Sequence, residues 1–387
     1  MLIQIIQLIV EYWVLRVIQF WFNWPVYFLK RFWNNMDAYH TAIDQYQSMK
    51  HCQLTRSVSY GNHPRERLHL LEPTQTTVRG TIFYVHGGGF VTSCREMYYN
   101  SFTYLCRRGY RVLIIDYPLS PQSRHPQPTL SILRCLNMLR CDAKWNVEEL
   151  HMIGDSAGAN LILSATAIVQ NPHVRTHFQS YLSQQDQELC RAFRFPRPLC
   201  CVSIYGMINR KVGSQHPYCG LGLNFLWQCI ANYEQNDSAL FPVSFADVIS
   251  IEQFQKLKFP PTSFVVGDGD PLLRDSLEVE RTMALMQYET EIHVFKGGFH
   301  GFFGVPPDWQ LGCWKYAAKP CSETVYDFLD GHTKKKRNMA IPLLGKRTIG
   351  NDFFGVIVIS QLVIVMPLVI IGVPLSLFWL LWRTTNC

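Results

Sequence analysis

The sequence contains few charged residues, and its cysteines follow no spacing that is typical of a metal site or a disulfide framework. Charged residues make up 17% of the 387, below the roughly 25% that is usual for soluble domains. This shortfall favours contact with a membrane. The 13 cysteines contain no C-x-x-C pair, which argues against a zinc site and a secreted disulfide framework. Reduced thiols are typical of a cytosol-facing protein, and neither a metal nor a cofactor is expected.

The first 35 residues lack the features of a cleaved signal peptide. They have no positive n-region, and no small-residue cleavage site follows them. The segment is apolar and rich in tryptophan, but Glu11 and Arg16 interrupt it. Residues 1–35 are therefore expected to form a membrane anchor or an interfacial helix with a tryptophan belt. A soluble cap helix is the alternative.

Residues 353–382 contain no charged side chain. A straight helix of this length would extend about 45 Å, which exceeds the roughly 30 Å of a hydrocarbon core. Pro367, Gly372 and Pro374 would kink such a helix or turn it back on itself. We expect this segment to be transmembrane or re-entrant.

The excess of positive charge is concentrated next to the apolar ends of the chain. Residues 331–352 form a basic linker that includes Lys334–Arg337, and Lys30 and Arg31 follow the first apolar segment. This position favours binding to anionic lipid over nucleic acid. If each end crosses the membrane once, the positive-inside rule places the catalytic domain in the cytoplasm. The expected location is the membrane of the endoplasmic reticulum. The sequon at 236–238 would matter only in a lumenal domain.

Residues 79–330 alternate between two kinds of pattern, which is typical of an α/β domain, and this domain with its cap elements is expected to span residues 36–330. Short β-rich runs are followed by glycine or acidic turns, and amphipathic stretches at 129–140 and 157–169 are expected to be helical. The predicted strands are 81–85, 110–116, 150–153, 199–205, 262–266 and 291–295. Strands that alternate with helices predict a mostly parallel central sheet with helices on both faces.

The stretch Gly154–Gly158 matches the pattern G-x-S-x-G and lies between a predicted strand and a predicted helix. In that context Ser156 would occupy a tight strand-to-helix turn, with its hydroxyl projecting above the sheet. The flanking glycines would relieve the crowding of such a turn. Ser156 is therefore the candidate nucleophile, although the motif alone is weak and a structural turn would also produce it.

A second glycine-rich stretch, His86 followed by Gly87–Gly89, comes directly after the strand predicted at 81–85. Successive glycines allow backbone N–H groups to converge on one point, where they can stabilise a developing oxyanion. A flexible loop or a phosphate cradle would use glycines too. The cradle is disfavoured because the G-K-[ST] continuation is absent.

A serine nucleophile requires a general base and a carboxylate to orient it. His300 follows the last predicted strand and is flanked by Gly298 and Gly301, so its imidazole can reach across the site. The loop after the strand at 262–266 offers three carboxylates, of which Asp270 is the first choice because Pro271 stiffens the loop. Asp268 is the alternative, and Asp275 is the third candidate.

Together these motifs resemble the hormone-sensitive-lipase family of the α/β-hydrolase fold, including arylacetamide-deacetylase-like and sterol-acetyl-esterase-like proteins. The resemblance covers about residues 79–330, and the order Ser156, Asp270, His300 is that of the fold. It implies an oxyanion hole made by Gly87, Gly88 and Ala157. It also implies a helical cap, built from the region after the anchor and from insertions near 176–197 and 206–260. Asp116 and Tyr117 fit the family pattern as well, but Pro118 replaces the arginine that usually follows.

The resemblance implies a serine hydrolase that cleaves carboxylic esters through an acyl-serine. Apolar ends would hold the site near a bilayer, so the expected partners are membrane lipids and a hydrophobic ester substrate, such as a lipid or sterol ester, or an amide. Two alternatives share the fold: an acyltransferase that uses the same triad, and a non-catalytic small-molecule receptor.

Overall fold

The computed structural model describes part of the chain, mainly residues between 52 and 333. The described residues are 52–74, 77–99, 102, 105–106, 108–145, 147–209, 233, 244–250, 259–296, 298, 300–303 and 314–333. The predicted segments 1–35 and 353–382 lie outside them, as does the basic linker beyond Thr333. No helix within this described part is long and apolar enough to cross a membrane.

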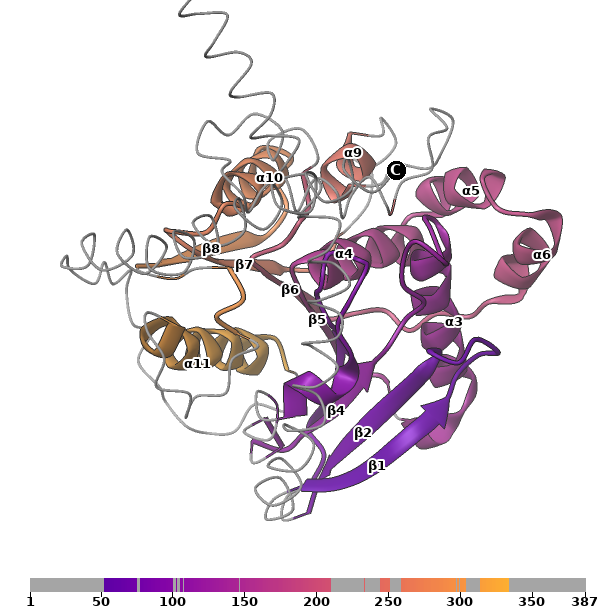
Figure 1. The fold of residues 1–387 in the computed structure, drawn as a ribbon, viewed down its shortest axis with the longest axis horizontal. Coiled ribbons are helices and arrows are strands. Elements are labelled where there is room, and N and C mark those ends of the chain that lie inside the picture. Colours follow the sequence, from indigo (N-terminus) through magenta and orange to yellow (C-terminus); the bar gives the residue numbers. More distant parts are fainter. Residues whose placement is uncertain are drawn as a thin grey trace, which may run out of the picture. The chain divides into compact units, whose positions relative to one another are not determined.

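An eight-stranded sheet forms the centre of the fold, in the order β1-β2-β4-β3-β5-β6-β7-β8 (Figure 1). The strands are β1 Cys52–Ser59, β2 Arg67–Pro73, β3 Gly80–Val85, β4 Tyr110–Ile115, β5 Leu150–Asp155, β6 Cys200–Ile204, β7 Thr262–Gly267 and β8 Thr290–Phe295. β2 is antiparallel to both β1 and β4, and the remaining neighbours are parallel. The predicted mostly parallel sheet is confirmed.

Helices cover both faces of this sheet, as predicted. One face carries α11, while α3, α4 and α10 lie over the other (Figure 1). The helices are α3 Gln127–Cys141, α4 Ala157–Gln170, α5 Pro172–Ser180, α6 Gln184–Ala192, α9 Phe245–Ile249, α10 Leu273–Leu285 and α11 Trp314–His332, with short 3-10 turns η1 Arg95–Tyr98 and η2 Ala143–Trp145. The expected helices at 129–140 and 157–169 correspond to α3 and α4.

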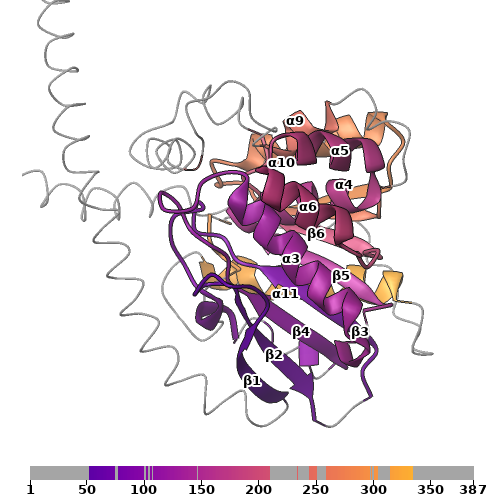
Figure 2. The same ribbon diagram turned by 90° about the vertical axis from the view of Figure 1, so that its right-hand side faces the viewer.

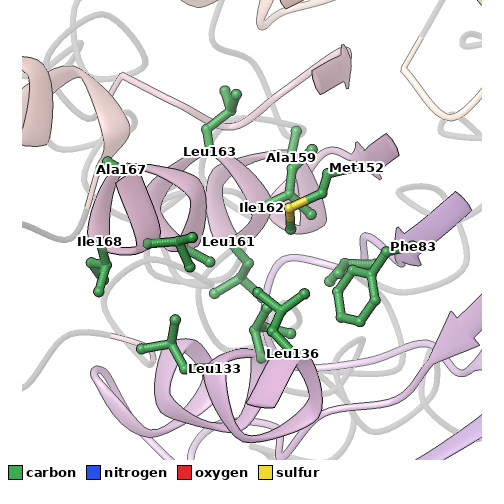
Figure 3. Close-up of a cluster of buried hydrophobic side chains, with 14 of the residues drawn as sticks. Phe83, Leu133, Leu136, Met152, Ala159, Leu161, Ile162, Leu163, Ala167 and Ile168 are labelled. Carbon is green, nitrogen blue, oxygen red and sulfur yellow. The ribbon is translucent and has the colours of Figure 1, made fainter. Parts of the chain in front are cut away.

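The central strands β3, β4, β5 and β6 contribute alternate side chains to two separate hydrophobic cores. In β3, Phe83 and Val85 pack in the core under α3 and α4, whereas Ile82 and Tyr84 pack in the core under α11. The side-chain period of two explains the division. Figure 3 shows Leu161 of α4 lying close to the α3 side chains within the first core. With both faces buried, β3 needs no polar positions, as its apolar sequence indicates.

Two of the regions expected to form a cap contribute instead to the sheet and to the helical layer, as far as the structure describes them. After the anchor, residues 52–73 form β1 and β2, which extend the sheet by a hairpin-like pair. The insertion near 176–197 forms α5 and α6, which pack beside α3 and α4 (Figure 2). Arg134 of α3 forms an ion pair of 2.9 Å with Asp186 of α6. Arg175 of α5 donates to the Ile168 carbonyl near the end of α4 remote from Ser156. Most of 206–260 lies outside the described residues.

Candidate active site

Ser156 stands at the turn between β5 and α4, as the motif predicts. Its φ of 51° and ψ of −118° lie outside the regions that serine normally occupies. The turn is tight because α4 starts directly against β3. A Cβ on Gly158 would lie 2.1 Å from the Val85 carbonyl oxygen, and one on Gly154 would lie 2.5 Å from the Gly158 carbonyl carbon. Only glycine fits both positions, which explains the spacing of the motif.

The fold brings Ser156, His300 and Asp270 together from three separate loops. Nε2 of His300 lies 3.0 Å from Oγ of Ser156, and Nδ1 lies 3.1 Å from Oδ2 of Asp270. Both are hydrogen-bonding distances. The residues follow β5, β7 and β8, so all three lie at the carboxyl edge of the parallel sheet, where ligands of open α/β sheets bind.

Of the three candidate carboxylates, Asp270 is the one that hydrogen-bonds to His300. Its side chain is buried, and it also accepts a hydrogen bond of 2.8 Å from the Leu272 amide, which fixes the carboxylate within its loop. Asp268 is exposed to solvent. Asp275 is buried in α10, where its carboxylate accepts from the Asn209 amide at 3.4 Å and desolvation raises its pKa well above the ordinary value.

Opposing effects act on the basicity of His300. Burial lowers the pKa of the imidazole, but the negative charge of Asp270 and its hydrogen bond raise it, and the charge of Asp155 adds to the rise. The net pKa of His300 is above its ordinary value of 6.5. An imidazole in this state accepts a proton readily from a hydroxyl 3.0 Å away.

The glycine loop after β3 lies against this triad, but its amides are arranged differently from the prediction. The Gly87 N–H donates to Oδ1 of Asp155 at 2.7 Å, so its hydrogen is already engaged. The amides of Gly88, Gly89 and Ala157 donate no hydrogen bond to another described residue. The prediction of Gly87 as an oxyanion donor is therefore wrong, and among the described residues the free amide next to Gly88 is that of Gly89. The sequence could not show this, because a run of three glycines does not reveal which amide turns inward.

A buried charge cluster supports the base of the loop. His86 is fully buried, with Nε2 3.2 Å from Oδ1 of Asp116. Burial raises the pKa of Asp116, but Arg65, His86 and Arg95 outweigh that effect, and the pKa falls to about 2. Arg65 also donates to the Tyr117 carbonyl at 3.0 Å. Pro118 stands where the resemblance leads us to expect an arginine after Tyr117. Arg65 and Arg95, from other parts of the chain, provide the positive charge beside Asp116.

Asp155 is a functional candidate that the sequence motif leaves unnamed, since it occupies a variable position of G-x-S-x-G. Its carboxylate is buried, and it accepts hydrogen bonds from the Tyr84 hydroxyl and the Gly87 amide. Both donors lie about 70 residues earlier in the chain, so no local pattern could have indicated the contact. Within the described part of the chain, no group of three or more His, Cys, Asp or Glu side chains is placed to hold a metal ion.

Comparison with known proteins agrees with this architecture. A family model described as "alpha/beta hydrolase fold" matches residues 82–304, which is more than half of the chain. The chain belongs to the α/β-hydrolase fold family. The resemblance to its hormone-sensitive-lipase branch is confirmed, since the chain is 26% identical over 283 residues to an acetyl esterase of Salmonella typhi, covering 70% of this chain and 76% of the relative.

Solved α/β-hydrolase structures share the fold at lower identity. Esterase B from Lactobacillus rhamnosis has a TM-score of 0.59 at 18% identity, covering 80% of this chain and 97% of that one. A hyperthermophilic esterase from Pyrobaculum calidifontis has a TM-score of 0.57 at 16% identity, covering 78% and 93%. These neighbours show the fold. The predicted enzyme class, a carboxylester hydrolase, is confirmed by the family model together with the acetyl esterase relatives.

Proposed function

We propose that this α/β-hydrolase is a membrane-attached serine hydrolase that cleaves carboxylic esters through an acyl intermediate on Ser156. The observation that carries the proposal is the pair of contacts made by His300. Its Nε2 lies 3.0 Å from the Ser156 hydroxyl, and its Nδ1 lies 3.1 Å from the Asp270 carboxylate. A nucleophile, a base and an orienting group in series are the elements of acyl transfer.

In the proposed reaction, Ser156 Oγ attacks the ester carbonyl carbon while His300 Nε2 takes its proton. Asp270 holds the imidazole with Nδ1–H toward its carboxylate and stabilises the imidazolium. The tetrahedral intermediate collapses as His300 returns the proton to the departing alcohol, which leaves an acyl-serine. Water, deprotonated by His300, then attacks the acyl carbon and releases the acid and the free serine.

The oxyanion formed in each step requires backbone donors. We assign this role to the amides of Gly88, Gly89 and Ala157, since these are not engaged with other described residues and the Gly87 amide is bound to Asp155. Ala157 is the first residue of α4, where the helix dipole adds partial positive charge. Loss of one such donor typically costs about 2.7–4 kcal/mol of barrier.

For the substrate, we propose a hydrophobic carboxylic ester, such as a lipid or sterol ester or another hydrophobic acyl ester. The support comes from the apolar segments 1–35 and 353–382, which would hold the site at a bilayer, and from the basic run Lys334–Arg337, which suits anionic lipid. A small acyl group is favoured because the curated relative is named an acetyl esterase. We place the protein at the endoplasmic reticulum membrane, and by the positive-inside rule its catalytic domain faces the cytoplasm.

The proposal is tested by hydrolysis of p-nitrophenyl acetate and labelling with a fluorophosphonate, in full-length protein in detergent. Ser156→Ala is expected to abolish both. Ser164→Ala, a buried serine later in the same helix, is the matched control and should retain both. Hydrolysis that persists at the wild-type rate in Ser156→Ala refutes the assignment, and an unlabelled wild type indicates a receptor. Product analysis with an added alcohol detects acyl transfer.

A further inference from the structure

The carboxylate of Asp155 links three parts of the structure beneath the active site. Oδ1 accepts from the Tyr84 hydroxyl at 2.5 Å and from the Gly87 amide at 2.7 Å. Oδ2 accepts from the Tyr98 hydroxyl at 3.4 Å. The donors belong to β3, to the glycine loop and to η1, while Asp155 directly precedes the nucleophile. One side chain therefore connects the serine turn to the loop that faces it.

The two contacts at Oδ1 have the lengths of hydrogen bonds to an ionised acceptor, which run about 2.5–2.7 Å for O–H donors and 2.7–2.9 Å for N–H donors. Such bonds are roughly twice as strong as neutral ones. Burial of Tyr84 raises the pKa of its phenol well above 10, so the phenol keeps its proton and acts as the donor. Asp155 is itself buried, so its contacts are little screened by solvent. Burial raises the pKa of its carboxyl above the ordinary value, and the hydrogen bonds from Tyr84 and Gly87 act against that rise by stabilising the carboxylate.

The contact with Gly87 determines the orientation of the residues that follow it. A Cβ on Gly87 would lie 2.5 Å from Oδ2 of Asp155 and 3.0 Å from Cβ of Ser156, so the loop backbone lies directly against the nucleophile turn. The next peptide groups begin from this fixed point. The amides of Gly88 and Gly89 are therefore placed relative to Ser156 through the bond between Gly87 and Asp155.

We infer that Asp155 is a positioning residue, whose carboxylate holds Gly87 and thereby aims the Gly88 and Gly89 amides at the oxyanion formed on Ser156. The inference rests on the proposed esterase function. Asp155 makes no contact with the substrate in this role. Its effect is on the transition state, because the amides bind the oxyanion more strongly than the ground-state carbonyl.

The test compares Asp155→Ala and Asp155→Asn with Asp330→Ala in the full-length protein. Asp330 is a matched control because its carboxylate also accepts from a tyrosine hydroxyl, Tyr110 at 2.7 Å, but lies on α11 and outside the site. In Asp155→Ala, kcat for p-nitrophenyl acetate should fall about 100-fold, with KM changed by less than about twofold. Asp155→Asn, which keeps one acceptor oxygen, should lose about tenfold. Asp330→Ala should keep kcat.

A second measurement isolates the oxyanion. With a trifluoromethyl ketone, Ser156 Oγ adds to the carbonyl carbon, its proton passes to His300, and the ketone oxygen becomes an oxyanion. The inhibition constant of this ketone should rise in Asp155→Ala by the same factor by which kcat/KM falls. Inhibition by the matching alcohol, which forms no oxyanion, should be unchanged.

Several outcomes overturn the inference while leaving the esterase function intact. One is a variant with a lowered melting temperature but wild-type kcat and ketone affinity. Another is a raised KM at constant kcat, which would place Asp155 in ground-state binding. If Asp155→Ala does not fold, the same two measurements on Asp155→Asn decide. Failure of the function itself is distinct, because wild type and Ser156→Ala would then hydrolyse the ester equally.

Discussion

The ring of His300 packs edge to face on Tyr205, with centroids 4.9 Å apart. Tyr205 follows β6, and its ring is also in edge contact with Phe302 at 5.0 Å. The imidazole therefore has an aromatic wall on one side and the Asp270 carboxylate at Nδ1. The wall restricts its rotation, while the carboxylate supplies the charge that an imidazolium needs.

This environment predicts the pH dependence of the hydrolysis. The pKa of His300 is raised above 6.5 because Asp270 and Asp155 outweigh the effect of burial. Neutral imidazole is required to accept the serine proton, so activity increases as pH rises through that pKa. We expect the acidic limb of a kcat/KM profile for p-nitrophenyl acetate to lie above pH 6.5.

Asp270→Asn removes the carboxylate charge, which raises the pKa of His300, and leaves the burial that lowers it. The acidic limb of the kcat/KM profile should therefore move to lower pH, and the rate of hydrolysis should fall. The measurement is a kcat/KM profile of wild type and variant at constant ionic strength. A limb that stays in place in the variant would mean that a group other than His300 is titrating.

The carboxylate assignment makes a separate prediction. Asp270→Asn retains the shape of the side chain but removes the charge that selects the correct tautomer, so kcat should fall by about 10⁴-fold. Asp268→Asn changes an exposed side chain and should alter kcat by less than about twofold. Both variants should melt within a few degrees of wild type. The reverse order of activities would transfer the role to Asp268.

The six strands β3 to β8 could be predicted from sequence, including β8 at one edge of the sheet, whereas the antiparallel strands β1 and β2 could not. The run at 81–85 is apolar at every position but one, and it corresponds to β3. β1 Cys52–Ser59 has its side chains partly in solvent, and its sequence mixes Gln53, Thr55 and Ser57 with apolar residues. Such a pattern carries little β signal, and the expectation of a cap in this region came from the family resemblance alone.

Within the site, the sequence identified residues that short motifs mark and missed those defined by long-range contacts. Glycines flank both Ser156 and His300, and they predict a tight turn at the serine and an open loop at the histidine. The engagement of the Gly87 amide depends on Asp155, whose carboxylate is distant in sequence and close in space. The arginines that compensate for Pro118 lie likewise in other segments.

The nucleophile turn predicts a strong effect at Gly158. In Gly158→Ala the new Cβ would lie 2.1 Å from the Val85 oxygen and 2.6 Å from the His86 oxygen, both backbone atoms of β3 and its loop. Neither can move without shifting the sheet, so the free energy of unfolding should fall by about 1–3 kcal/mol or more. Urea denaturation measures it.

Gly331→Ala is the control for this change, because a Cβ added at this position in α11 would have no atom of another described residue within 4 Å, its chain neighbours and the backbone of the helix apart. Alanine is a better helix former, so stability should rise by up to about 1 kcal/mol. Equal stability of the two variants would contradict the close approach of α4 to β3.

The proposed orientation in the membrane can be tested by the modification state of Asn236. Asn236 and Ser238 form a sequon within the catalytic region, and a lumenal domain would expose it to glycosylation. If the positive-inside rule sets the topology, the protein carries no glycan and its gel mobility is unchanged by N-glycosidase. Protease digestion of sealed microsomes is the decisive measurement of this orientation, because some lumenal sequons are not glycosylated. The catalytic domain should be degraded without detergent, while a lumenal marker protein stays intact. A domain that is protected until detergent is added would place the active site in the lumen and refute the cytoplasmic assignment.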